Sequence, residues 1–152
     1  MPSVTISHLY TFVAMIAVSS ILIFSFMTYA NGWRLTSETM QLKNQMSFVA
    51  GKCTELITLA LSTNASSQTS LQVLQKIGDK QYWLQLHSLS GKAWLDGGLG
   101  DIPLEQGDWQ VFLPREANAS GYYISESGAA SIRCNFVNGI LEIELSCLGK
   151  GD

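Results

Sequence analysis

The N-terminal part of the chain carries no charged side chain. No Asp, Glu, Lys or Arg occurs before Arg34, although the whole chain holds 9 basic and 12 acidic residues. Within this part, Leu9–Tyr29 is a mostly apolar run of 21 residues without Pro or Gly. As a helix it would be about 30 Å long, which matches the hydrocarbon core of a bilayer. The sequence therefore predicts a transmembrane anchor helix over residues 1–32, with the lipid bilayer as its partner.

A cleaved secretory signal is the main alternative for this segment. Such signals begin with basic residues and have an apolar core of about 7–15 residues. Residues 1–8 contain neither Lys nor Arg, and the apolar run is longer than such a core. We therefore expect the helix to stay in the membrane.

The orientation in the membrane is not fixed by the residues. Arg34 and Lys43 follow the apolar run, which favours a cytoplasmic body under the positive-inside rule. Asn64 and Asn118 each begin an Asn-Ala-Ser sequon, and these candidate glycosylation sites favour a body outside the cytoplasm. Both orientations stay open at this point.

A second predicted helix covers residues 33–63 and is amphipathic. Apolar residues recur at steps of three and four along one side of it, as in a helix with one apolar stripe. The stripe consists of Leu42, Met46, Val49, Cys53, Leu56 and Ala60. Such a stripe either joins copies of the chain in a coiled coil or packs on the chain's own globular part. It is too short for several clean heptads, so the sequence favours packing on the body.

The hydrophobic period changes to two beyond the polar segment Thr63–Ser70. Short strand-like segments separated by turns, with no helix between them, predict a β-domain over residues 71–148. Asp96–Asp101 is expected to be a glycine-rich loop between strands. The predicted fold class is therefore α+β, with a long N-terminal helix packed on an antiparallel sheet or small β-sandwich.

The clearest β-element is a hairpin around Asn138-Gly139, the dipeptide typical of a two-residue turn. Alternating apolar and polar residues flank it on both sides. A two-residue turn fixes the register, so Cys134 is expected to face Ile143, and Arg133 to face Glu144.

The chain has an odd number of cysteines, Cys53, Cys134 and Cys147. In the predicted register, Cys134 and Cys147 are about four positions apart along the sheet. That is ~13 Å, which is too far for a disulfide. Cys53 lies on the helix stripe and would reach either one if the stripe packs on the sheet. A disulfide from Cys53 to Cys134 or Cys147 and three buried free thiols are both open hypotheses.

Signals for specific chemistry are weak. The net charge of −3 argues against a nucleic-acid partner, because phosphate binding needs clustered basic residues. His87 stands beside two serines but without a nucleophile motif, so neither an enzyme nor a cofactor is predicted. Two alternative binding hypotheses rest on residue types alone, a calcium site and a glycan platform. The calcium candidates are Asp96, Asp101, Glu105 and Asp108, and the platform candidates are Trp83, Trp94 and Trp109.

The order of an uncharged helix, an amphipathic helix and a β-domain resembles archaeal type IV pilin-like proteins, including minor pilins and archaellum-associated anchor proteins. Two segments are similar, the helical stretch Ser19–Ile57 and Leu74–Leu84, which looks like the start of the β-domain in such proteins. The resemblance implies a non-catalytic surface protein of the cell membrane with its body outside the cytoplasm. It also implies contact with further copies in a filament, or with pilus or envelope proteins. Residues 1–8 lack the basic leader of pilin precursors, which favours a permanent anchor.

Overall fold

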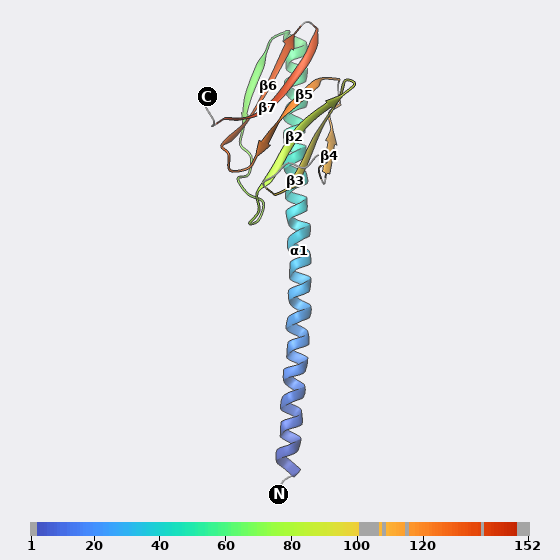
Figure 1. Cartoon of the computed structure of the whole chain (residues 1–152), viewed down its shortest axis with the longest axis vertical. Helices are drawn as coiled ribbons and strands as arrows, with labels where there is room; N and C mark the ends of the chain where they lie inside the picture. Colours follow the sequence, from blue (N-terminus) through green and yellow to red (C-terminus); the bar gives the residue numbers. More distant parts are fainter. Residues whose placement is uncertain (1–2, 101–106, 108, 115, 138, 149–152) are drawn as a thin grey trace. The chain divides into compact units, whose positions relative to one another are not determined.

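The computed structural model describes residues 3–100, 107, 109–114, 116–137 and 139–148 (Figure 1). Its internal contacts divide the chain into two compact units, Met1–Ser37 and Glu38–Asp152. The fold is α+β, with one helix, α1 (Ser3–Thr63), followed by strands only. The strands are β1 (Ser67–Leu71), β2 (Tyr82–Leu89), β3 (Lys92–Leu99), β4 (Trp109–Phe112), β5 (Asn118–Ile124), β6 (Ala129–Val137) and β7 (Ile140–Leu148).

The two helical segments expected from the sequence form one continuous α-helix of 61 residues. It ends at Thr63, and Asn64 follows with a φ of 51°. This left-handed conformation is common directly after a helix, where Asn is one of the few residues that adopt it readily. The local sequence therefore accounts for the position at which α1 stops.

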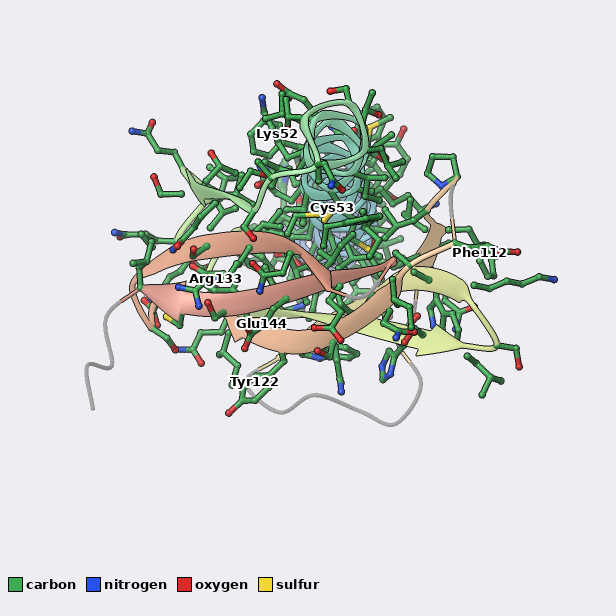
Figure 2. The ribbon with its side chains drawn as sticks, turned by 90° about the horizontal axis from the view of Figure 1, so that it is seen from above. Lys52, Cys53, Phe112, Tyr122, Arg133 and Glu144 are labelled. Carbon is green, nitrogen blue, oxygen red and sulfur yellow. The ribbon has the colours of Figure 1, made fainter. Side chains whose placement is uncertain are left out.

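The apolar stripe of α1 packs on the sheet. All six stripe residues are at most 6% exposed, and they share one core cluster with sheet residues such as Leu84, Leu95 and Ile143. Figure 2 shows Cys53 on the side of the helix that faces the sheet and Lys52 on the opposite side. Burial of one such apolar side chain contributes about 1.5–3 kcal/mol. The predicted packing on the chain's own body is confirmed.

The seven strands form one mixed sheet in the order β1-β6-β7-β5-β2-β3-β4. Five strand pairings are antiparallel, as predicted, but β5 and β7 are parallel, so the prediction of an antiparallel sheet is corrected at this pair. β5 is shared between neighbours. Its first half, Asn118–Gly121, pairs with β7, and its second half, Tyr122–Ile124, pairs with β2. The crossing point is Gly121.

Gly121 makes the parallel pairing sterically feasible. Its φ is +102°, and a Cβ placed there would lie 2.1 Å from the carbonyl oxygen of Leu145. No other residue type fits both the backbone conformation and the space. The contact between β5 and β7 therefore depends on the absence of a side chain at Gly121.

The predicted hairpin is confirmed in both its strands and its register. β6 and β7 pair with Cys134 opposite Ile143 and Arg133 opposite Glu144. Gly139 has a φ of +82°, as a two-residue hairpin turn requires, while Asn138 lies outside the described residues. Figure 2 shows Arg133 and Glu144 on the face of the sheet away from α1.

Two expectations about strand boundaries were wrong. Ser67–Leu71, which begins in the segment predicted as a polar loop, is the edge strand β1, paired with β6. Asp96–Leu99, predicted as a loop, continues β3. The glycines there serve close packing, because a Cβ at Gly97 would lie 2.9 Å from Met46 Sδ, and one at Gly98 would lie 2.9 Å from the Trp83 ring.

We predict opposite effects of the same substitution at two glycines. Gly121→Ala should destabilise the protein by about 3 kcal/mol or more, because it creates a backbone clash and an unfavourable φ. Gly51→Ala is the control, since Gly51 lies in α1 and a Cβ added to it would meet no atom within 4 Å. That variant should gain about 1 kcal/mol from helix propensity. Denaturant unfolding of the full chain in detergent, followed by tryptophan fluorescence, measures both. Equal stability of the two variants would show that a side chain at position 121 is compatible with the pairing of β5 and β7.

Candidate functional site

The first unit of the chain presents an exposed apolar helical surface. Leu9, Phe12, Ile21, Phe24 and Phe26 are each more than half exposed. Among the described residues, α1 is the one helix long and apolar enough to cross a membrane, and its most apolar window is wholly unburied within the protein. A single exposed apolar surface of this kind requires lipid or protein around it.

The second unit brings together three of the residues singled out by their chemistry, His87, Trp94 and Asp96, on the sheet face away from α1. His87 and Trp94 stack with ring centroids 5.7 Å apart, and Phe112 lies 6.3 Å beyond Trp94. The indole N–H of Trp94 donates a hydrogen bond of 3.2 Å to Asp96 Oδ2. His87 Nε2 lies 3.5 Å from the same oxygen. β2, β3 and β4 bring these side chains together because they are neighbours in the sheet.

The polar centre of this cluster at Asp96 is buried, whereas Phe112 at its edge is exposed and His87 is partly exposed. Asp96 is only 3% exposed, and two of the cluster's polar atoms, His87 Nε2 and Asp96 Oδ1, are buried without a hydrogen-bond partner. No hydrogen bond joins His87 to a serine hydroxyl among the described residues. The arrangement therefore supplies an acid and an imidazole without a nucleophile, and its observed contacts hold β2 against β3.

The three tryptophans do not form a shared platform. Trp83 is fully buried, and Trp94 lies on the face away from α1. Trp109 lies on the opposite side, where Lys43 of α1 places its Nζ 3.6 Å from the ring centroid. This cation–π contact stabilises the packing of α1 against β4. The sequence did not reveal this distribution, because the face of each tryptophan depends on strand pairing.

The calcium hypothesis can be followed only at Asp96. Asp101, Glu105 and Asp108 lie outside the described residues. Asp96 is buried, and its Oδ2 accepts the Trp94 hydrogen bond while its Oδ1 has no hydrogen-bond partner. In the part of the chain that the structure describes, no group of three or more metal-ligating side chains comes together.

Both sequon asparagines are on the surface of the second unit. Asn64 directly follows α1, and Asn118 is the first residue of β5. Each side chain is exposed, and so is Ser120, which completes the second sequon. Their positions are accessible to a modifying enzyme on whichever side of the membrane the body lies.

The cysteines are free thiols in the structure. Cys53 and Cys134 are fully buried in the core shared by α1 and the sheet, whereas Cys147 is partly exposed and its Sγ lies 2.8 Å from the Ser127 carbonyl oxygen. Cys147 pairs in register with Ala130, four positions from Cys134, as predicted. Burial, with a smaller effect of Cys134, raises the pKa of Cys53 to about 12.

The sequence did not predict two further features of the body. Lys80, in the connection between β1 and β2, forms an ion pair of 2.9 Å with Glu38 of α1. A cavity next to Leu61 brings the end of α1 beside Glu116 and the β6–β7 hairpin. Both contacts join segments far apart in the chain, and no local pattern indicates them.

Comparison with known proteins finds no relative. The chain matches no protein-family model, no curated protein and no solved structure. We therefore infer its function from its residues and their geometry.

We predict that Asp96 is a structural residue of the β2–β3 pair. Asp96→Ala removes the acceptor of the Trp94 indole and should cost about 1–3 kcal/mol in the free energy of unfolding. Asp96→Asn keeps an acceptor oxygen and should cost less. Thermal melting of the full chain in detergent, with calcium and with EDTA, measures both variants. A calcium-induced rise in the melting temperature that Asp96→Ala abolishes would show instead that Asp96 is a calcium ligand.

We also predict the order in which the thiols react. At pH 8 the thiolate fraction of Cys53 should be about a thousandfold lower than that of a thiol with the ordinary pKa of 9, because its own pKa is raised to about 12. Iodoacetamide should therefore label Cys147 in the folded protein, and Cys53 and Cys134 only after unfolding. Mass spectrometry of the labelled peptides gives the order. Failure of Cys53 to react after unfolding without a reductant would demonstrate the disulfide hypothesis.

Proposed function

We propose that this chain is a non-enzymatic protein of the cell surface, anchored in the membrane by α1 and related in architecture to type IV pilin-like proteins. One observation carries the proposal, namely the change of environment along a single helix. Apolar side chains of α1 are exposed as far as Leu35, whereas from Leu42 onward one stripe is buried under the sheet. The same helix thus provides an anchor and the core of the body.

Membrane anchoring explains the composition of the first part of α1. Covering the apolar surface of a helix with lipid is favourable by about 25 cal/mol of transfer free energy for each Å² removed from water. The segment before Arg34 contains no charge that would oppose insertion. Tyr29 and Trp33, whose rings are 5.8 Å apart, follow the apolar run in the manner of interfacial aromatic anchors.

A position of the body outside the cytoplasm is supported by its surface. Both sequons, one at a helix end and one on a strand, have exposed Asn and Ser side chains. The body also buries its apolar stripe fully, so it needs no membrane for its own folding. We propose that it acts there as a structural or interaction module.

The exposed apolar part of α1 is compatible with two arrangements, a permanent anchor in lipid and a subunit packed against copies of itself. We propose the permanent anchor as the first of these to test. Mass spectrometry of the N-terminus of the protein from its native membrane distinguishes them. Removal of these residues would favour a filament subunit.

We predict that the body is accessible from outside intact cells. Leu89 is 69% exposed at the end of β2, so Leu89→Cys should react with a membrane-impermeant maleimide. The substitution is made in a Cys147→Ser background to remove the partly exposed native thiol. Labelling of intact cells should equal labelling of permeabilised cells.

The Cys147→Ser chain without the added cysteine is the matched control and should remain unlabelled in its folded state. Labelling of Leu89→Cys that occurs only after permeabilisation would place the body in the cytoplasm and overturn the proposed surface role. Solubility of the full chain in alkaline carbonate would separately overturn the membrane anchor.

A further inference from the structure

A cavity of about 270 Å³ opens at the end of the second unit where α1 finishes. Its walls come from the last turns of α1, the turn between β2 and β3, the segment leading into β5, and the β6–β7 hairpin. The apolar lining residues are Leu61, Ala117, Phe136, Ile140 and Leu141. The cavity is therefore built from four segments that only the folded body brings together.

Part of the cavity lining is buried and part is exposed. Ala117 and Leu141 are buried, and Phe136 pairs in register with Leu141 across the hairpin. The backbone N–H of Ala117 donates a 3.1 Å hydrogen bond to the Gly91 carbonyl, which fixes the neighbouring turn. Leu61 and Ile140 are about half exposed. The recess is therefore lined by apolar side chains together with the polar residues Glu116 and Asn118.

Glu116 supplies the one charge among the described residues that line this cavity. The Glu116 side chain is exposed. A Cβ built at Gly91 would lie 3.6 Å from the Glu116 carboxylate, so no side chain of residue 91 covers this carboxylate. The described part of the chain places no ion pair on this carboxylate. An apolar recess with one carboxylate at its edge selects a ligand that is apolar along its length and positive at one end.

We propose that this cavity binds the side chain of a lysine presented by a protein partner. The four methylene groups of lysine would lie against the apolar lining, and the ammonium group would bind the Glu116 carboxylate. A compact ammonium on a flexible stem suits a single carboxylate, whereas a guanidinium is wide, planar and best matched by bidentate contacts. An anionic side chain would be repelled by Glu116. Asn118 of the second sequon also lines the cavity, so the proposal concerns the chain without a glycan at this residue.

The test is an NMR titration of the isotope-labelled full chain in detergent micelles. The probe is Nα-acetyl-lysine methyl amide, and the matched control probe is the same molecule with its ε-amine acetylated. We expect saturable shifts at the amides of Ala117, Gly139 and Leu141 with the lysine probe, and at least about tenfold weaker binding of the acetylated one. Binding of the two probes with equal affinity, or no shift at these amides, would overturn the proposal.

Two variants show whether the carboxylate and the apolar wall are both used. Glu116→Gln should weaken binding about tenfold without unfolding the protein, because the side chain is exposed. Ile140→Ser, also at an exposed position, should weaken it to a smaller degree. Glu55→Gln is the matched control, an exposed carboxylate on α1 that pairs with Lys52, and it should bind as the original chain does.

Arg115, the neighbour of Glu116 in sequence, lies outside the described residues and is tested directly. With Arg115→Gln we expect lysine binding to be unchanged or stronger. Binding that appears only in this variant would overturn the proposal, because Glu116 would then serve as an internal partner of Arg115.

Discussion

The packing of α1 against β3 is the contact on which the body depends. Met46 of α1 occupies the space above Gly97, where a Cβ would approach its sulfur to 2.9 Å. This close approach lets the helix stripe reach Leu84 and Leu95, which flank the glycine in the sheet and are fully buried. A single sheet without such a cover would expose both faces to water and would be marginally stable. The helix is therefore the second layer of the body.

One helix serves two environments because the distribution of its polar residues changes near the boundary between the units. Glu38, the first residue of the second unit, is 8% exposed and forms an ion pair with Lys80. Before it the large apolar side chains of the helix are exposed, and after it one apolar stripe is buried under the sheet. A helix that is apolar all round suits lipid, whereas a striped helix suits a sheet. The sequence already shows a change along the helix, since charged residues begin at Arg34 and the apolar stripe begins at Leu42.

The features predicted correctly are those set by local physics. The β6–β7 register follows from a two-residue turn, and the α1 stripe follows from the helical period. The errors arise where distant contacts decide. β1 is polar because it lies at a sheet edge, β3 continues through Gly97 because α1 packs there, and the parallel β5–β7 pair depends on the space beside Gly121. The contact of His87 with Asp96 and the cavity beside Leu61 also join segments that are distant in sequence, so no local pattern predicts them. Residue type alone identifies His87 and Asp96 as candidates for chemistry, but not their contact.

The distribution of exposed surface indicates where the body is able to meet a partner. One face of the sheet is covered by α1, and on the other face Trp83 and Asp96 are buried. The two sheet edges are poor sites for adding a strand. β1 has four polar residues out of five, and β4 is only four residues long and is followed by Pro114 within two positions. The sheet face away from α1 also exposes Phe112 and Tyr122, whereas the end beside Leu61 combines a recess, exposed apolar side chains and the Glu116 carboxylate. Recognition at that end would leave both the core and the exposed apolar part of α1 undisturbed.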